Sequence, residues 1–404
     1  MANTVEWIEN VQADYQDVPL LAHLTPAIAE EILAYHRTWP EYRETPMHSL
    51  PHLAAYAGVR SIYVKDEAKR FGIHSFKILG GTWAVARALA ERWRLESPVS
   101  ASSLKAAASW APCVTLAAAS DGNHGMGVAW TARELGQRAV IFLPAGTRSS
   151  RVERIAALGA EVHVTDMNYD DTVQHVAQQA AEHGWLLIQD TSWPGYEQIP
   201  RWVTQGYLSM ALEAFQQLGA QGMEPPTHVI LQAGVGSLAA AVTGFYANRY
   251  GAANCPTILI AEPTLAPALL ESARRSDGQL AKIGGPMETV MAGLACGEPN
   301  PLAWPLLRSW AGFFVACSDS VAARGTRILS NPLGEDPRIL AGESGSMPLG
   351  LLVSLMDDPR FHKAREAFRL TSQSRILLFN TEGIPDPGLF LDIVWNGDYC
   401  AEPK

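Results

Sequence analysis

The sequence predicts an α/β protein of two units, each built on a mostly parallel, twisted sheet flanked by helices. Short apolar runs rich in β-branched residues alternate with helical patterns between residues 125 and 189. The same alternation returns between residues 228 and 262. The chain of 404 residues is also long enough for two domains, each with its own core.

The first stretch contains six elements in alternation. Apolar residues at helical spacing indicate the helices, and short apolar runs indicate the strands between them. Gly159 and Gly184 stand where helices commonly end, because glycine accepts the left-handed backbone of a C-terminal cap. The expected elements are helix 128–135, strand 139–143, helix 151–159, strand 161–165, helix 170–184 and strand 185–189.

The second stretch repeats this order, with a strand at 228–232, a helix at 237–246 and a strand ending near Glu262. Residues 96–112 are small, polar and weakly patterned, so we expect a surface insertion there. Because parallel strands place ligands beyond their carboxyl ends, functional residues are expected directly after these apolar runs.

Composition narrows the class of protein. Hydrophobic residues make up 48% and charged residues 18%, which is typical of a compact globular chain. A net charge of −10 without long Lys/Arg runs argues against a nucleic-acid partner. No segment approaches the roughly 18 apolar residues of a membrane span, and the N-terminus has no apolar signal region, so we expect a cytoplasmic protein. The five cysteines are expected to be mostly buried thiols without metal spacing.

A lysine in the apolar, glycine-flanked run 75–81 is the first candidate for chemistry. Lys77 precedes the helical pattern 82–93 and is expected to be partly desolvated. Desolvation weakens an ammonium's hold on its proton, which favours an amine that forms a Schiff base with an aldehyde. The alternative is a lysine that extends to solvent from a helix start.

Two polar loops between strand and helix form the next candidates. Residues 120–125, S-D-G-N-H-G, offer main-chain N–H groups to a carboxylate, with Asp and Asn side chains for proton transfer and hydrogen bonding, or form an ordinary capped turn. Residues 232–238, Q-A-G-V-G-S-L, offer a glycine-lined phosphate site at a helix start. They also satisfy G-x-G-x-x-A with Glu262 ending the next strand, which keeps a dinucleotide site open.

Residues 189–193 and 342–346 also lie where crevice residues belong. Asp190 is either an acid or base in the cleft or the N-terminal cap of the helix leading toward Tyr207. His124 is the one histidine inside a motif, and no H-E-x-x-H or paired-carboxylate signature appears, so no metal is expected.

The SFK lysine, the SDGNHG loop and the glycine loop, in this order, resemble the fold-type II pyridoxal-phosphate enzymes, which include threonine dehydratases and the tryptophan synthase β-subunit. Further strings resemble the diaminopropionate ammonia-lyase family across about residues 40–396. These strings are VTDMNYDDTV from 164, QDTSWPGYEQIP from 189, TVMAGLACGEPNP from 289, and DPRILAGESG ending at Gly345.

The resemblance implies a division of roles among the candidates. Lys77 would bind pyridoxal 5′-phosphate covalently, and Asn123 would contact its ring hydroxyl. The phosphate would lie on the main chain of Gly234, Val235, Gly236, Ser237 and Leu238, and the substrate would contact Ser120, Asp121, Gly122, His124 and Asp190. The implied domains are 1–82 plus 203–404, which bind the cofactor, and 83–202, which carries the SDGNHG loop.

The implied reaction is the α,β-elimination of ammonia from 2,3-diaminopropionate. It would give aminoacrylate and then pyruvate with a second ammonia. Both enantiomers would be accepted, because Lys77 and Asp121 would take the Cα proton from opposite faces. Asp190, with Asp121, would keep the departing nitrogen protonated. A homodimer is implied as well. The alternatives are a serine/threonine dehydratase-like lyase, a catalytically weak pyridoxal-phosphate-binding relative and an NAD-dependent oxidoreductase.

One string departs from the family pattern. Where the family has T-E-G-D-T-D, this chain has Thr381-Glu382-Gly383-Ile384-Pro385-Asp386. If either replaced polar residue normally contacts the pyridine nitrogen, the electron-withdrawing strength of the cofactor changes. Proline at 385 also removes a main-chain N–H donor.

Overall fold

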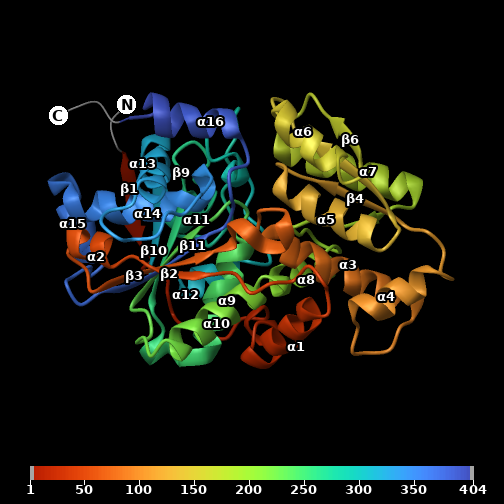
Figure 1. Ribbon diagram of the computed structural model, residues 1–404, viewed down its shortest axis with the longest axis horizontal. Helices are drawn as coiled ribbons and strands as arrows, with labels where there is room; N and C mark the ends of the chain where they lie inside the picture. Colours follow the sequence, from red (N-terminus) through yellow and green to blue (C-terminus); the bar gives the residue numbers. More distant parts are fainter. Residues whose placement is uncertain (1–3, 401–404) are drawn as a thin grey trace.

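The computed structural model describes residues 4–400, which form two sheets side by side, each covered by helices (Figure 1). Within these residues the larger sheet has seven strands in the order β1-β10-β9-β8-β11-β3-β2. Neighbours pair in parallel except at the two edges, β1 with β10 and β2 with β3. The strands are Val5–Glu9 (β1), Met47–Ser49 (β2), Ser61–Asp66 (β3), His228–Gln232 (β8), Thr257–Pro263 (β9), Phe313–Cys317 (β10) and Arg375–Asn380 (β11).

The smaller sheet has four strands in the described chain, in the order β6-β5-β4-β7, and all of them are parallel. They are Thr115–Ala119 (β4), Arg138–Leu143 (β5), Glu161–Val164 (β6) and Leu186–Leu187 (β7). All four lie within 83–202, the predicted smaller domain, while α3 and α8 run across its two boundaries. The expectation of two mostly parallel sheets is confirmed, and the residue limits of the domains stay a proposal.

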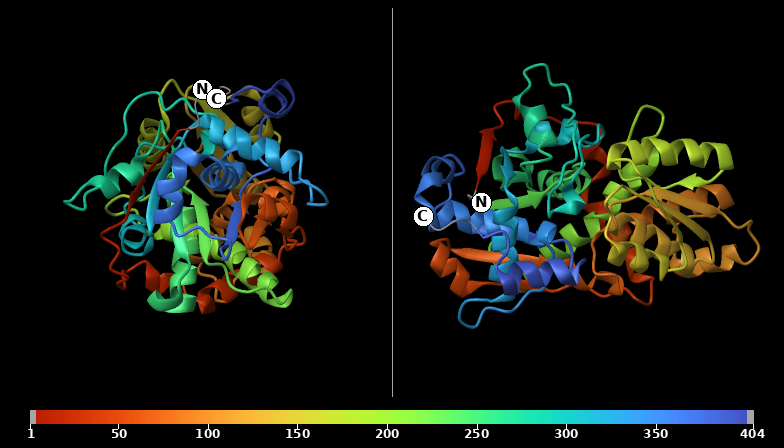
Figure 2. Two further views of the ribbon diagram at one scale, coloured as in Figure 1. Left: turned by 90° about the vertical axis from the view of Figure 1, so that its left-hand side faces the viewer. Right: turned by 90° about the horizontal axis from the view of Figure 1, so that it is seen from above.

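Helices cover both faces of each sheet (Figure 2). They are Pro26–Arg37 (α1), Pro51–Ala57 (α2), Lys77–Trp93 (α3), Ala101–Ala108 (α4), Asn123–Glu134 (α5), Ser149–Ala156 (α6), Tyr169–His183 (α7), Gln198–Gly206 (α8), Leu208–Ala220 (α9), Ser237–Asn254 (α10), Ala268–Arg274 (α11), Trp304–Trp310 (α12), Asp319–Ser330 (α13), Glu343–Asp357 (α14), His362–Ala367 (α15) and Pro387–Leu391 (α16). Shorter helical turns are Leu21–His23 (η1), Glu67–Gly72 (η2), Ala292–Leu294 (η3), Pro359–Phe361 (η4) and Asp392–Asn396 (η5).

The residues of the central strands divide between two cores. On β8, Val229 and Leu231 belong to the core on one face of the large sheet, and Ile230 between them belongs to the core on the other. Successive side chains of a strand point to opposite faces, so a fully apolar strand signals a sheet covered on both sides. This burial explains why strands 228–232 and 257–263 read as continuous apolar runs.

The structure differs from the expected elements in several places, and α3 and α5 each begin five residues earlier than expected. The segment 96–112 contains α4, which a Ser100–Ser103 capping box starts and which buries Leu104 and Ala107. Its apolar pattern spans only two turns, too short to stand out in the sequence. Strand β7 covers two residues of the expected 185–189, and α10 continues beyond 246 to Asn254.

The expectation of mostly buried cysteines is wrong. Cys296 and Cys317 are buried, Cys255 is half-buried, and Cys113 and Cys400 are exposed. Cys113 lies in the loop before β4 and Cys400 follows the last helical turn, where little of the chain packs over them. In the part of the chain that the structure describes, no helix is long and apolar enough to cross a bilayer.

The topology brings several polar loops to one place. Strands β3, β11, β8 and β9 run in the same direction, so their carboxyl ends meet at one edge of the large sheet. The chain continues there into Thr381 after β11 and into Ala233 after β8. This edge faces the smaller sheet, whose strand β4 ends at Ala119, directly before the SDGNHG loop.

Candidate active site

A cavity of about 560 Å³, open to solvent, lies at this edge between the two sheets. Its walls come from the start of α3, the loops after β8 and β11, and the segment around η3. The lining residues are Phe76, Lys77, Asn123, Asp190, Tyr207, Gln232, Ala233, Gly234, Val235, Gly236, Ser237, Leu238, Gly293, Leu294, Cys296, Ser344, Thr381 and Glu382.

Lys77, the first residue of α3, lies between two carboxylates. Its Nζ is 3.3 Å from Asp121 Oδ1 and 3.2 Å from Asp190 Oδ2. Burial alone would lower the pKa of Lys77, but the two carboxylates raise it well above its ordinary value. The expected weakening of its hold on the proton is therefore wrong for this arrangement, because two nearby negative charges outweigh desolvation. Lys77 here is an ammonium in a tight charge cluster and does not extend into solvent.

Asp190 is fixed by several donors. Tyr169 donates its hydroxyl to Asp190 Oδ1 at 2.8 Å, and Gln189 Nε2 donates to the same oxygen at 3.2 Å. Burial would raise the pKa of Asp190, but Lys77, His124 and the hydrogen bond from Tyr169 lower it to about 2. Since the next helix begins only at Gln198, Asp190 is a cleft carboxylate and does not cap a helix. Tyr169, at the start of α7, was not singled out in the sequence.

The SDGNHG loop joins β4 to α5 and folds around the Ser120 hydroxyl, which accepts hydrogen bonds from the amides of Gly122 and Gly125 at 2.9 and 2.7 Å. His124 is fully buried and pairs through Nε2 with the Ile188 carbonyl at 2.7 Å. A carbonyl only accepts, so that nitrogen carries the proton. Ser120, Gly122 and His124 therefore shape the loop, while Asp121 contacts Lys77.

Asn123 contributes to the cavity wall directly. Its Nδ2 donates to Glu382 Oε2 at 2.6 Å, and Glu382 Oε1 accepts from the main-chain N–H of Ser344 at 3.2 Å. Burial raises the pKa of the Glu382 carboxyl. Glu382 and Ser344 join the end of β11 and the start of α14 to the SDGNHG loop. The two residues that depart from the family pattern, Ile384 and Pro385, are not among those that line the cavity.

The glycine loop after β8 leads into the N-terminus of α10 and lines the opposite part of the cavity. Gly236 has φ +98°, and a Cβ there would approach Leu307 Cδ1 to 3.2 Å, so no other residue fits without strain. Free main-chain N–H groups at a helix start favour an anion such as phosphate. Gly234, Val235, Gly236, Ser237 and Leu238 all lie in the wall, and their binding of a phosphate stays a prediction.

Asn300 and Ser192 support the glycine loop from outside the cavity, through contacts that the sequence did not reveal. Asn300 Nδ2 donates to Ser237 Oγ at 2.9 Å, and the Asn300 amide donates to the Val235 carbonyl at 2.7 Å. Ser192 in turn donates its hydroxyl to Asn300 Oδ1 at 2.6 Å. Only the string around 289–301 hinted at this segment, and its 63-residue distance in sequence from Ser237 hid the contact.

Glu262, the candidate ribose ligand of a dinucleotide site, has another task. Its two carboxylate oxygens accept the main-chain N–H groups of Leu269 and Leu270, both at 2.8 Å. The side chain is fully buried. Both oxygens are thereby used at the start of α11, so Glu262 has no free oxygen for a ribose hydroxyl.

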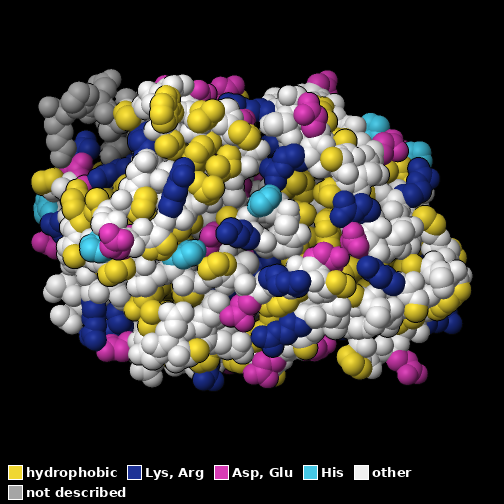
Figure 3. Space-filling view, in the orientation of Figure 1, with side chains coloured by type: hydrophobic (Ala, Val, Ile, Leu, Met, Phe, Trp, Pro, Cys, Tyr) yellow, Lys and Arg dark blue, Asp and Glu magenta, His cyan; other side chains and the backbone are white. Residues whose placement is uncertain are grey.

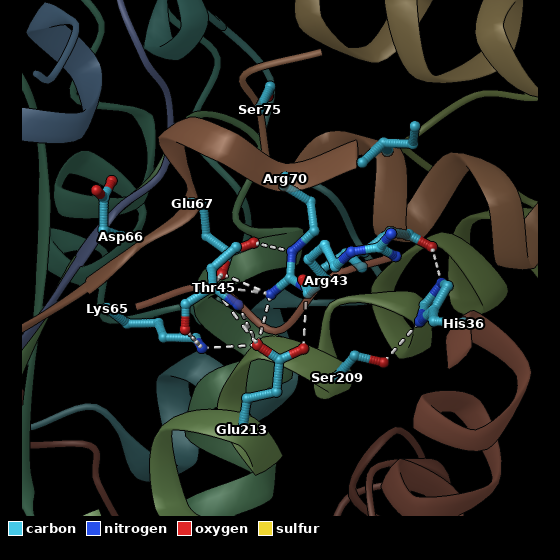
Figure 4. Close-up of polar contacts among 12 residues, drawn as sticks. His36, Arg43, Thr45, Lys65, Asp66, Glu67, Arg70, Ser75, Ser209 and Glu213 are labelled. Atoms are coloured by element: carbon cyan, nitrogen blue, oxygen red, sulfur yellow. Dashed lines mark hydrogen bonds and ion pairs between the residues drawn. The ribbon is translucent and has the colours of Figure 1, made fainter. Parts of the chain in front are cut away.

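A buried ionic network supports the segment that leads to Lys77 (Figure 4). Glu213 on α9 accepts from Lys65 Nζ at 2.6 Å and from Arg70 Nη2 at 2.7 Å, and Arg70 also pairs with Glu67 at 2.7 Å. All four side chains have no exposed surface. The network ties β3, η2 and α9 together only a few residues before Lys77.

The residues present suit pyridoxal 5′-phosphate. One wall of the cavity contains the Lys77 amine, which can react with an aldehyde. Another wall contains a glycine-lined helix start, which can bind a phosphate. Asp121 Oδ2 and Gln232 Oε1 are buried polar atoms at this site that have no hydrogen-bond partner within the described chain. Such atoms are costly unless a ligand or water satisfies them.

On the face drawn in Figure 3, Lys and Arg side chains are interspersed with Asp and Glu side chains. That face therefore carries no continuous basic surface of the kind that binds a polynucleotide.

Comparisons with known proteins agree with this geometry. The family profile described as "Pyridoxal-phosphate dependent enzyme" matches residues 38–370. The chain is 45% identical, over 95% of both chains, to diaminopropionate ammonia-lyase of Escherichia coli K12. Crystal structures of the Escherichia coli enzyme in complex with D-serine and with an aminoacrylate-PLP azomethine reaction intermediate superpose with TM-scores of 0.93 and 0.91, at 42% and 41% identity, and each covers 99% of both chains.

Proposed function

Because this chain belongs to the pyridoxal-phosphate dependent enzymes, and within them to the diaminopropionate ammonia-lyase family, we propose that it eliminates ammonia from both the D and L isomers of 2,3-diaminopropionate. The fold is the expected fold-type II architecture, and the cofactor is pyridoxal 5′-phosphate. The nicotinamide alternative is wrong, because the family differs and Glu262 is engaged with α11.

One observation carries the proposal: a single lysine amine touches two buried carboxylates at 3.3 and 3.2 Å inside a cavity that also contains a phosphate-type helix start. An elimination that begins with a Cα proton and ends with loss of an amine needs several proton-transfer groups. A site that only binds a ligand does not require two carboxylates at the amine.

Lys77 and Asp121 divide the first proton transfer. The bound cofactor supplies an electron sink that makes the substrate Cα–H acidic. The Lys77 amine takes this proton from the L isomer, and the Asp121 carboxylate takes it from the opposite face of the D isomer. A mirror-image substrate presents its Cα–H to the other side, so two bases give tolerance of both isomers.

Asp190 acts on the leaving nitrogen. Its low pKa keeps it ionised at neutral pH, and Tyr169 and Gln189 fix its direction. An ionised carboxylate keeps the Cβ nitrogen of the substrate as an ammonium, which departs far more readily than an amide ion. Released aminoacrylate then reacts with water to give pyruvate and a second ammonia.

The remaining roles rest on the family resemblance. Asn123, which donates to Glu382, contacts the ring hydroxyl of the cofactor, and Gly234 to Leu238 hold its phosphate. Ser120, Gly122 and His124 shape the loop that receives the substrate carboxylate. A homodimer in the cytoplasm belongs to the same proposal and rests on the family resemblance; light scattering of the purified protein tests the dimer.

The test is a visible spectrum of the purified protein, borohydride reduction, and assays of pyruvate and ammonia with each isomer. We expect a yellow, borohydride-reducible chromophore and two ammonia for each pyruvate. Serine and threonine are the comparison substrates. Faster turnover of these hydroxy amino acids favours a dehydratase, whereas a chromophore without turnover of any substrate favours a weak relative.

A further inference from the structure

Arg151 lies outside the cavity and holds the loop that carries Asp121 and Asn123. This arginine lies on α6, and its Nη1 donates to the main-chain carbonyl of Asp121 at 2.8 Å. Its side chain also lies over Gly122, where an added Cβ would meet Arg151 Cδ at 3.4 Å and Nη1 at 3.6 Å. Gly122 has φ +136°, a backbone conformation that only glycine adopts readily, so the guanidinium stem occupies the space that the missing side chain leaves.

The Asp121 carboxylate has little else to orient it. Oδ1 contacts Lys77, and Oδ2 is buried without a hydrogen-bond partner in the described chain. A Lys77 amine that held the cofactor aldehyde would no longer be free to contact Asp121 as it does here. The direction of the carboxylate then depends on the main chain of residues 120–122, which the Ser120 hydroxyl holds on one side and Arg151 on the other.

Helix α6 is itself anchored across the cleft. Arg148, the residue before it, pairs with Asp386 Oδ2 at 2.7 Å. Arg154 donates to the Pro385 carbonyl at 3.3 Å and to the Ile73 carbonyl at 3.4 Å. These contacts join the unit that contains α6 to the chain on the other side, and α6 lies opposite α16 in Figure 1. Arg151 therefore holds the loop from a helix that is itself anchored to the other side of the cleft.

We propose that Arg151 is a positioning residue that fixes the direction of the Asp121 carboxylate and thereby sustains turnover of the D isomer. The inference rests on the proposed function, in which Asp121 is the base for that isomer. The L isomer depends on Lys77, the first residue of α3.

The kinetic test compares Arg151→Gln, Arg151→Lys and the control Arg154→Gln with the unaltered enzyme on both isomers. We expect Arg151→Gln to lower kcat for the D isomer about tenfold and kcat for the L isomer less than about threefold, because small displacements of a catalytic group have large kinetic effects. Arg151→Lys keeps a donor and restores part of the D activity. Arg154→Gln loosens one anchor of the same helix but leaves the hydrogen bond from Arg151 to Asp121 in place, so we expect it to change the D-to-L ratio of kcat less than Arg151→Gln does.

A second measurement does not depend on activity. Hydrogen–deuterium exchange of peptides covering residues 115–126 reports how firmly the loop is held. We expect faster exchange there in Arg151→Gln than in Arg154→Gln, with and without pyridoxal phosphate.

The two arms separate the possible failures. Unaltered exchange in Arg151→Gln, or equal losses of kcat on both isomers, overturns the positioning role of Arg151. If the unaltered enzyme turns over neither isomer, the proposed function is overturned. If it turns over only the L isomer, the role of Arg151 in turnover of the D isomer is overturned. In both cases hydrogen exchange still tests whether Arg151 holds the loop.

Discussion

Lys77 combines two properties at the residue scale: an amine suited to an aldehyde and contact with two carboxylates. We expect Lys77→Ala to remove the chromophore that borohydride fixes to the protein. The glycine loop still offers its phosphate site, so the variant keeps measurable but dialysable cofactor. Absorbance spectra before and after borohydride and dialysis check this. A chromophore that stays attached to Lys77→Ala contradicts the assignment of the lysine.

Asp121 and Asp190 contact the same amine from different directions, which separates their expected effects. Asp121→Asn keeps the shape and removes the base, so kcat on the D isomer should fall at least about tenfold more than kcat on the L isomer. Asp190→Asn is the matched control, because loss of the leaving-group partner affects both isomers. Steady-state kinetics on the two pure enantiomers measure the ratio, and equal losses in Asp121→Asn refute the facial assignment.

At the scale of elements, the glycine loop depends on the segment that carries Asn300. Asn300→Ala removes the side-chain donor to Ser237 Oγ and the acceptor of the Ser192 hydroxyl, whereas the main-chain hydrogen bond to the Val235 carbonyl remains. The start of α10 then loses its fixed form, and we expect the Kd for pyridoxal phosphate to rise about tenfold, with a smaller rise in Ser192→Ala, which is one contact further away. Fluorescence titration of the cofactor-free protein measures both values. An unchanged Kd in Asn300→Ala shows that the loop holds its own form.

The departure of Ile384 and Pro385 from the family pattern also concerns a single element, the loop after β11. The sequence alone linked it to the pyridine nitrogen and the electron-withdrawing strength of the cofactor, which implies a change in turnover when Asp and Thr replace the two residues. The cavity wall instead contains Thr381 and Glu382 from this string. We therefore expect kcat of Ile384→Asp/Pro385→Thr to stay within about twofold and its cofactor absorbance band to stay in place. A clear rise in turnover restores the first interpretation.

Sequence reasoning found the elements whose signal is local. Lys77, the SDGNHG loop and the glycine loop stand at strand ends or helix starts, and the resemblance joined them into one site. Sequence reasoning missed the contacts of Tyr169, Asn300 and Arg151, because the partners of these contacts lie 21, 63 and 30 residues away in the chain. Spacing cannot reveal such pairs. It also misjudged the pKa of Lys77, since the desolvation was visible in the pattern and the two facing carboxylates were not.

At the scale of the whole molecule, the buried network around Glu213 connects strand β3 of the large sheet to the segment that precedes Lys77 (Figure 4). Burial would raise the pKa of Glu213, but Arg70 and Lys65 lower it below its ordinary value of 4.5. A carboxyl whose pKa is lower in the folded chain stabilises the fold above the unfolded pKa, and this stabilisation is lost as the pH falls through the folded pKa. The network should therefore contribute fully at neutral pH and progressively less below about pH 4.5.

Glu213→Gln tests this dependence. At pH 7 the variant leaves Lys65 and Arg70 with less negative charge in a buried site, and removing one partner of such a network costs about 3–5 kcal/mol. We expect a clearly lower melting temperature at pH 7 and a difference that narrows toward pH 3, because the Glu213 carboxyl of the unfolded chain then gains a proton while that of the folded chain, with a pKa of about 2, stays ionised. Glu224→Gln is the matched control, since its pair with Arg60 at 2.7 Å is about half exposed and contributes little. A gap in melting temperature that stays constant from pH 7 to pH 3 contradicts the ionised state of Glu213.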